Sequence, residues 1–137
     1  MKAVIKEYYS IDIPDLFTYQ PSDPAYFGFN LQFILGPDEE SKRDFEEIFN
    51  LFVCTPNYVS TYIELSYPTL DVVFSRPLIF VREYNFKVLL NAISKHISAA
   101  EGKTWEEVAM QISLIAQWEF ENYKPQKTTF WRLVVFD

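Results

Sequence analysis

The sequence predicts an α+β fold: a mainly antiparallel sheet with two long C-terminal helices packed on one face, a short helix and a C-terminal strand. Three observations support this fold class. Segments with the two-residue periodicity of strands come early in the chain, segments with helical periodicity follow, and a β-branched and aromatic segment closes it. With 137 residues, the whole chain, residues 1–137, is expected to form a single domain.

The first strands and their connections follow from alternation and turn residues. Residues 2–9 predict a strand, and residues 10–24, which contain three prolines, predict a long loop. Residues 27–35 alternate most clearly between apolar and polar side chains. A Gly-Pro-Asp turn from Gly36 then leads to a strand over residues 45–54, which is apolar on both faces toward its end. We therefore expect a hairpin whose second strand lies inside the sheet.

The middle of the chain predicts a short helix, a strand and the first long helix. Thr55-Pro56 is typical of a helix N-cap followed by proline in the first turn, so a helix is expected over residues 56–65. The apolar run that begins at Leu78 predicts a strand over residues 78–84. Asn85 is expected to cap a helix that continues to about Ala100.

The second long helix begins with a capping box. Thr104 and Glu107 have the spacing in which a hydroxyl and a carboxylate satisfy free N–H groups of the first turn. Gly102 suits the left-handed backbone conformation that ends a helix, here the first long helix. The helix is expected to continue to about Tyr123, before Pro125, and residues 128–136 predict the last strand.

Acidic residues dominate the charge and gather in the first half of the chain. The chain has 19 acidic and 12 basic residues, a net charge of −7, of which −6 falls within residues 1–56. A general nucleic-acid binder needs the opposite sign, so no nucleic-acid partner is expected. Six of the acids lie beside the predicted hairpin turn and are candidate partner-binding residues: Asp38, Glu39, Glu40, Asp44, Glu46 and Glu47.

The long loop supplies a second set of candidate partner-binding residues. They are Asp12, Asp15, Tyr19 and Asp23. The loop is surrounded by aromatic residues, most of which are expected to fill the core, and the others could anchor a protein interface. Loops of this length in a compact domain are usually functional.

Much catalytic and cofactor chemistry is excluded by composition. One cysteine and one histidine cannot form a disulfide framework, a Cys-based zinc site or a two-histidine metal motif, and three glycines leave no Gly-rich phosphate loop. Cys54 ends an apolar strand, and His96 lies at the boundary of a helix face, so neither is expected to be catalytic. We expect no enzyme activity, no cofactor and no metal.

The chain shows no segment typical of secretion or of membrane insertion. Its first residues alternate charged and apolar side chains instead of forming an apolar core, and no stretch approaches the ~20 apolar residues that span a bilayer. We therefore expect a cytoplasmic protein with no membrane partner.

The chain resembles the immunity protein 8 family of bacterial polymorphic toxin and contact-dependent inhibition systems. The resemblance covers residues 1–123 and rests on short motifs in order: Tyr19-Gln20-Pro21, Asp23-Pro24, Phe27-Gly28-Phe29, Leu31-Gln32, Gly36-Pro37, Phe52-Val53-Cys54-Thr55-Pro56, Gly102-Lys103-Thr104-Trp105-Glu106-Glu107 and Trp118-Glu119-Phe120-Glu121-Asn122-Tyr123. Tyr58 stands where the family pattern has a Trp, and residues 124–137 have no counterpart in it.

The resemblance implies a cytoplasmic antidote that binds the C-terminal domain of a cognate toxin and has no catalytic residues. We expect Trp105 and Trp118 in the core. An acidic face fits an inhibitor of a basic nuclease, because such an enzyme carries positive charge where phosphates bind. Two other functions stay open: an enzyme or small-ligand-binding domain with a pocket beside the long loop, and a generic intracellular adaptor.

Overall fold

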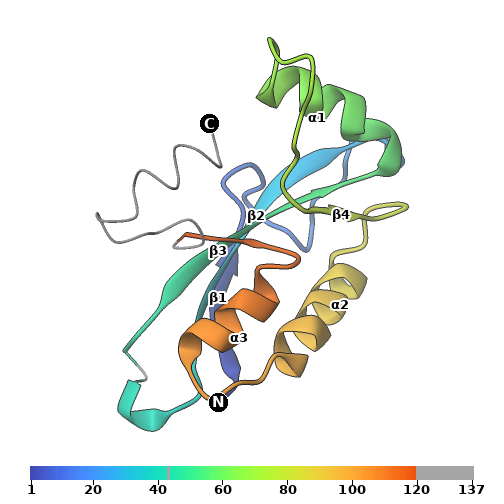
Figure 1. Cartoon of the computed structure of the whole chain (residues 1–137). Coiled ribbons are helices and arrows are strands. Elements are labelled where there is room, and N and C mark those ends of the chain that lie inside the picture. Colours follow the sequence, from blue (N-terminus) through green and yellow to red (C-terminus); the bar gives the residue numbers. More distant parts are fainter. Residues whose placement is uncertain (43, 120–137) are drawn as a thin grey trace.

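The computed structural model describes residues 1–42 and 44–119, which form one α+β unit (Figure 1). A sheet in the order β1-β2-β3-β4 is built from β1 (Ala3–Tyr9), β2 (Gly28–Pro37), β3 (Glu47–Cys54) and β4 (Leu78–Phe80), and β5 (Gln117–Trp118) also pairs with β3. Three α-helices accompany the sheet: α1 (Val59–Ser66), α2 (Phe86–Ala99) and α3 (Trp105–Ile112). The predicted fold class is confirmed.

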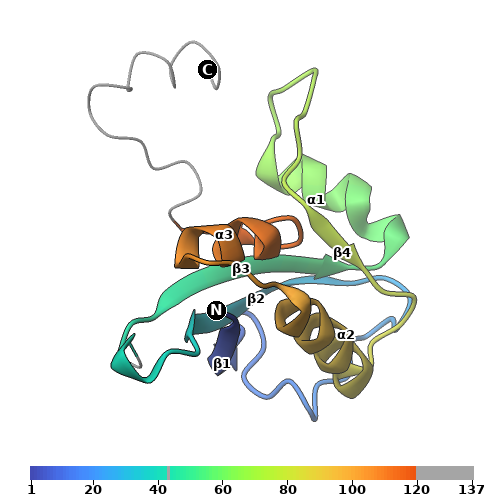
Figure 2. The ribbon, with the colours of Figure 1, turned by 60° about the horizontal axis from the view of Figure 1, so that its bottom comes forward.

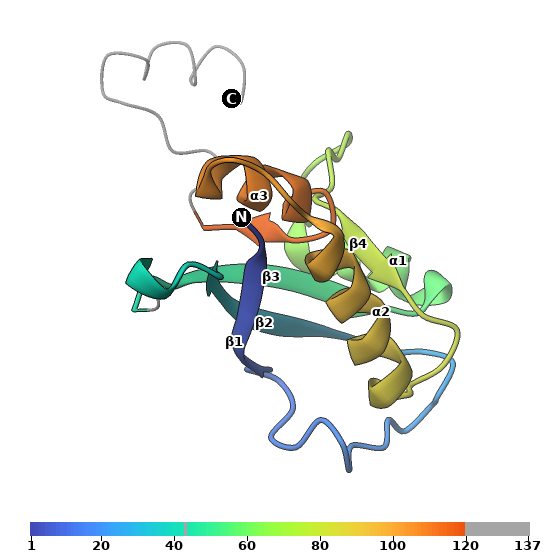
Figure 3. The same cartoon turned by 90° about the horizontal axis from the view of Figure 1, so that it is seen from below.

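The core lies between one face of the sheet and the helices α2 and α3. Alternate residues of β2 and β3 are buried on this face, and both helices lie on the same side of the sheet (Figure 3). The most deeply buried strand residues are Leu31, Phe33, Leu35, Phe49, Val53 and Cys54. The two-residue periodicity of the sequence therefore identifies the core face correctly.

The predicted hairpin forms between β2 and β3. The two strands pair antiparallel over the whole length of β3, from Gly28 opposite Cys54 to Leu35 opposite Glu47. Their connection, residues 38–46, contains a 3₁₀ turn, η1 (Glu40–Lys42). β3 has β2 on one side and other strands on its second side, so its predicted interior position is confirmed.

The outer edge of β3 is shared by two short strands. β4 runs parallel to β3 opposite Phe52–Cys54, and β5 runs antiparallel to it opposite Phe49 and Asn50. β4 is shorter than the predicted strand at residues 78–84, because β3 ends at Cys54 and offers no further partner.

The second C-terminal helix is much shorter than predicted. α3 ends at Ile112 instead of near Tyr123, and the chain turns through residues 113–116 into β5. The turn is tightened by bonds from Leu114 N–H to Gln111 O and from Ile115 N–H to Ile112 O. Most helices are stable only when they pack against the rest of the fold. Here the pairing of residues 117–118 with β3 and the burial of Trp118 stabilise a strand more than the local sequence stabilises a helix.

Side-chain caps begin both helices of the helical layer. Asn85 Oδ1 accepts from Val88 N–H at 3.3 Å, and Thr104 Oγ1 accepts from Glu107 N–H at 3.2 Å, as predicted. The carboxylate of Glu107 accepts from Lys103 N–H at 2.7 Å, so the second arm of the capping box contacts a neighbouring residue.

Two local predictions are wrong. Gly102 does not adopt a positive φ, and its lack of a side chain instead allows close approach, because a Cβ there would lie 2.7 Å from Glu107 Cβ. Thr55 precedes Pro56 at the start of η2 (Pro56–Tyr58), the 3₁₀ turn that continues into α1, as predicted. Its hydroxyl, however, makes no capping bond and accepts from Phe27 N–H at 3.2 Å. The strand predicted at residues 128–136 lies outside the described residues.

Residues 1 and 2 contact residues 101 and 102, which lie between α2 and α3. Lys2 forms an isolated bridge with Glu101, and Gly102 N–H donates to Met1 O at 3.1 Å. The pairing of β1 with β2 shifts register between Ile5 and Glu7, which lets Ile5 and Tyr8 both pack against the core. The first strand therefore depends on residues about 100 positions later in the sequence.

Candidate functional site

An acidic turn forms one end of the molecule. We name residues 38–46 the acidic hairpin turn; it lies at the opposite end of β3 from α1 (Figure 2). Five of the predicted partner-binding carboxylates are exposed on it: Asp38, Glu39, Glu40, Asp44 and Glu46. The structure thus brings these five side chains together at a surface that a partner can reach.

The acidic hairpin turn is held by contacts within itself and to the rest of the fold. Asp38 Oδ1 accepts from Lys2 N–H at 3.0 Å, and within the turn Lys42 lies 3.8 Å from the Glu39 carboxylate. Lys6 Nζ donates to Phe45 O at 2.9 Å, and the Phe45 ring, 42% exposed, contacts Trp105 edge-on with centroids 6.1 Å apart. Among the acids of this turn, Glu40, Asp44 and Glu46 take part in none of these contacts.

Glu47 differs from the other five acids because it is buried, with 7% exposure. Its Oε2 accepts from Trp105 Nε1–H at 2.9 Å and also from Trp118 Nε1–H. Both indole rings are buried, as predicted, and Trp118 stacks on Phe49 with an interplanar angle of 8°. Glu47 joins β3, α3 and β5, and its carboxylate is not part of the acidic surface.

The carboxylates of the long loop accept backbone hydrogen bonds. Asp15 Oδ1 accepts from Phe17 N–H at 3.0 Å and Asp23 Oδ1 from Ala25 N–H at 2.9 Å, in the manner of Asx turns. Asp12 Oδ2 accepts from Asn30 N–H at 2.7 Å and so joins the loop to β2. All three aspartates are nevertheless exposed, so the loop presents them to solvent.

Tyr19 belongs to an aromatic cluster beneath the long loop. Its half-buried ring packs edge-on against Tyr84 at 5.0 Å, and Tyr84 OH donates to Leu16 O. Burial, with smaller contributions from Tyr19 and Asp15, raises the pKa of Tyr84 to about 12. The cluster fixes the loop to the core.

The two sets of predicted partner-binding residues are far apart. The long loop leads into the first residue of β2, and the acidic hairpin turn follows its last residue. Ten residues of β2 at about 3.3 Å each place the two ends about 30 Å apart. They are separate candidate contact regions.

Cys54 and His96, the two side chains considered for catalysis, differ in their exposure to solvent. Cys54 is fully buried at the end of β3, and burial raises the pKa of its thiol. His96 is exposed on α2. Within residues 1–42 and 44–119, no group of three or more His, Cys, Asp or Glu side chains is placed to hold a metal ion.

Sequence reasoning missed a groove between β4 and α2. It has a volume of about 560 Å³ and is lined mainly by apolar residues of these two elements. The signals in the sequence were the apolar run at Leu78 and the apolar stripe of α2, but only the folded chain places them side by side.

No helix of the described part of the chain is long and apolar enough to cross a bilayer.

The fold and its surface define a small α+β domain with one strongly acidic end and buried, hydrogen-bonded tryptophans. Comparison with protein families then identifies its class. Residues 3–123 match the family model described as Immunity protein 8, and the chain belongs to this family. The family implies an immunity protein whose partner is a toxin. No curated protein matches the chain, and no solved structure matches it.

Proposed function

We propose that this chain is a cytoplasmic immunity protein that neutralises its cognate toxin by binding the toxin's C-terminal domain through the acidic hairpin turn. The observation that carries the proposal is the exposure of five carboxylates on one connection of an immunity-family protein. The chain acts as a binding inhibitor and not as an enzyme. The buried Cys54 thiol supports this, because a raised pKa keeps a thiol protonated and poorly nucleophilic.

The charge of the turn points to the chemistry of the toxin surface. Exposed carboxylates attract a basic partner over several ångströms and speed its encounter. A nuclease carries such basic residues where it binds phosphates, so we propose a nuclease domain whose nucleic-acid groove is covered by the acidic hairpin turn. Heparin, a polyanion, should then compete with the chain for the toxin, and binding that heparin does not affect would refute this site of contact.

The contact at the acidic hairpin turn is tested by charge reversal at two of the acids whose carboxylates make no hydrogen bond or ion pair with the described residues. Glu40→Lys/Asp44→Lys should slow association with the toxin domain about tenfold at low salt, because these carboxylates steer encounter. The difference should shrink as salt screens the charges. Stopped-flow mixing with an inactive form of the cognate toxin domain measures the rate.

A matched double variant controls for net charge. Glu64→Lys/Asp71→Lys makes the same charge change at exposed acids of α1 and the following loop. It should slow association much less. Equal slowing by both variants would refute a specific role of the turn, and an unchanged rate in both would redirect attention to the long loop with Asp12, Asp15, Tyr19 and Asp23.

A further inference from the structure

A pocket lies between the acidic hairpin turn and the first turn of α3. Its volume is about 460 Å³, within the range of ligand-binding clefts, and Met1 at the start of the chain completes its wall (Figure 1). Phe45 from the turn and Trp105 from α3 line it, and their rings contact each other edge-on with centroids 6.1 Å apart. We name it the Glu47 pocket, because Glu47 also lines it. It adjoins the surface proposed for the toxin contact.

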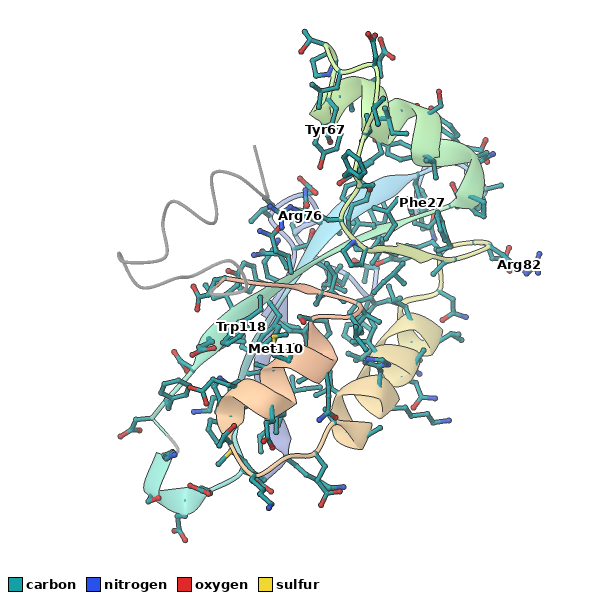
Figure 4. All side chains as sticks on the ribbon, in the orientation of Figure 1. Phe27, Tyr67, Arg76, Arg82, Met110 and Trp118 are labelled. Carbon is teal, nitrogen blue, oxygen red and sulfur yellow. The ribbon has the colours of Figure 1, made fainter. Side chains whose placement is uncertain are left out.

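Glu47 has one carboxylate oxygen without a hydrogen-bond partner. Its Oε2 accepts from the indole N–H groups of Trp105 and of Trp118, which lies beside α3 (Figure 4). Its Oε1 accepts no hydrogen bond from the described residues. Among these residues, Gln32 Oε1 is the only fully enclosed side-chain oxygen or nitrogen that lacks a partner, so Glu47 Oε1 keeps some contact with solvent. The pocket gives a hydrogen-bond donor a route to this oxygen.

Glu47 also lacks the cation that a buried carboxylate ordinarily has. The side chain is 93% buried, since its exposure is 7%. Between described residues the one ion pair joins Lys42 to Glu39, so no described cation, the N-terminal ammonium group included, pairs with Glu47. Buried carboxylates are usually paired with a cation. The pocket therefore contains an acceptor whose usual partner the described chain does not supply.

Net charge alone does not select an occupant for this pocket. Besides Glu47, its lining carries two carboxylates, Glu39 and Glu106, and two lysines, Lys42 and Lys103. The selection comes from the unpartnered oxygen together with the two aromatic rings beside it. A complementary group donates hydrogen bonds, carries positive charge and packs against aromatic rings.

We propose that the Glu47 pocket binds an arginine side chain of the toxin, whose guanidinium group donates to Glu47 Oε1. This inference rests on the proposed function and names a residue type on the toxin side of the same interface. A guanidinium group has five N–H donors and no acceptor, and it stacks on aromatic faces such as those of Phe45 and Trp105. The apolar stem of arginine packs well against apolar walls, here Met1 and Phe45. The ammonium group of lysine is more strongly hydrated and has no planar face to stack.

The pocket gives the interface an anchor that the exposed carboxylates do not provide. Exposed charges mainly speed encounter, whereas buried contacts slow dissociation, and arginine is enriched among such anchors. A nuclease domain of the kind proposed above carries arginines where it binds phosphates. One of these side chains, held by Glu47, would be withdrawn from nucleic acid.

A small probe tests the pocket in the chain alone. The indole N–H signals of Trp105 and Trp118 report on Glu47 directly, because both groups donate to its carboxylate. In nitrogen–proton correlation spectra, millimolar N-acetyl-arginine amide should shift both signals. N-acetyl-citrulline amide, which has the same shape without the charge, should shift them about fivefold less. Signals that move for neither probe, or equally for both, would refute the site.

The same spectra test whether the chain fills the pocket itself. Arg43 and Arg132 are the arginines outside the described residues. Arg43→Gln/Arg132→Gln should leave both indole signals where they are in the unsubstituted chain. A shift of both signals would show that one of these arginines occupies the pocket, and the proposal would be overturned.

Glu47→Gln tests the contact with the toxin. The glutamine oxygen can serve both indoles, while its amide N–H group replaces Oε1 and repels a guanidinium group. The inactive toxin domain should dissociate from this variant about tenfold or more faster. Val108→Ala controls for lost stability, because Val108 is fully buried in α3 and does not line the pocket. It should dissociate within about twofold of the unsubstituted rate at a temperature where melts show both variants folded.

A second variant fills the pocket without changing Glu47. Glu106 is exposed and lines the pocket, so Glu106→Arg supplies a guanidinium group that competes with the toxin arginine. It should speed dissociation several-fold more than Glu64→Arg, which makes the same charge change on α1. This variant replaces Glu47→Gln if the latter unfolds.

A double-mutant cycle identifies the toxin residue. Each exposed arginine of the toxin domain is replaced by alanine and measured against the unsubstituted chain and against Glu47→Gln. One replacement should weaken binding strongly to the unsubstituted chain and much less to Glu47→Gln, because the shared contact is already lost there. Coupling of Glu47 to a toxin lysine, or to no basic residue, would refute an arginine in the pocket.

The outcomes separate this inference from the proposed function. If the unsubstituted chain does not bind the toxin, the proposed function fails and the toxin arginine fails with it, even where the probe binds. If the toxin binds but dissociates from Glu47→Gln and Glu106→Arg at the unsubstituted rate, only the arginine contact is refuted.

Discussion

Removal of the Glu47 carboxylate is expected to be among the most damaging single changes in this fold. Both Trp105 and Trp118 donate their indole N–H groups to Glu47 Oε2, and all three side chains are buried. Glu47→Ala removes two hydrogen bonds that buried indole donors make to a charged acceptor. At about 1.5–3 kcal/mol for each bond, the free energy of unfolding should fall by about 3–6 kcal/mol.

Glu47→Gln separates the charge of this group from its geometry. The carbonyl oxygen of glutamine can accept from both indoles, so two hydrogen bonds remain but lose their charged acceptor. Neutral bonds contribute about 0.5–1.5 kcal/mol each, so this variant should lose about 2–3 kcal/mol. Because a domain of this size has about 5–15 kcal/mol in total, Glu47→Ala would remove a large share of its stability.

Urea unfolding measured by far-ultraviolet circular dichroism tests these values without depending on tryptophan emission. Glu46→Ala is the control, because its exposed carboxylate lies next along the chain and should change stability by less than about 0.5 kcal/mol. If Glu47→Ala stays within about 1 kcal/mol of the unsubstituted chain, the two indoles are not held by this carboxylate. In cells, Glu47→Ala should lose protection through lost folded protein, whereas Glu40→Lys/Asp44→Lys should lose it with the fold intact.

Two further predictions concern the helix cap and the aromatic cluster. Thr104→Ala should lower the free energy of unfolding by about 1 kcal/mol in urea titrations, because Glu107 N–H loses its acceptor, and Lys103→Ala should change it little. Between pH 10 and about 12 the unfolded chain releases the Tyr84 phenol proton while the folded chain, with its raised pKa of about 12, keeps it, so stability should fall as pH rises through this window. Tyr84→Phe should reduce that fall in urea titrations at successive pH values, and an unchanged slope would show that the phenol does not titrate differently in the folded chain.

The parts of the fold that depend on local signals were predictable from the sequence. Alternation located the β2–β3 hairpin, and the caps at Asn85 and Thr104 located the starts of α2 and α3. The end of α3 was not predictable in this way, because residues 117–118 form a strand only against the free edge of β3. Secondary structure that is created by a distant partner leaves no local signal.

In the candidate site, too, the features set by local signals were predictable and those set by distant partners were not. Exposure of Glu40 and Asp44 follows from a run of charges beside a turn, which usually lies in solvent. Glu47 belongs to the same run, but its burial depends on tryptophans 58 and 71 residues later in the sequence. The groove between β4 and α2 depends on how a strand and a helix are placed in space, which periodicity alone does not determine.

Strands near the beginning of the sequence contact segments near residue 100 and residues 117–118. These contacts determine when the protein can finish folding during its synthesis. The first strand is held at Lys2 and Met1 by Glu101 and Gly102, and β3 acquires its outer neighbour at residues 117–118. A ribosome adds roughly 5–20 residues per second, so the β2–β3 hairpin is made seconds before the segments that complete the sheet. Pairings this distant in sequence also slow folding, because the intervening chain must be closed into a loop first. We therefore expect the sheet to be completed only after residue 119 has left the ribosome, with the apolar face of the hairpin uncovered until α2 and α3 have been made.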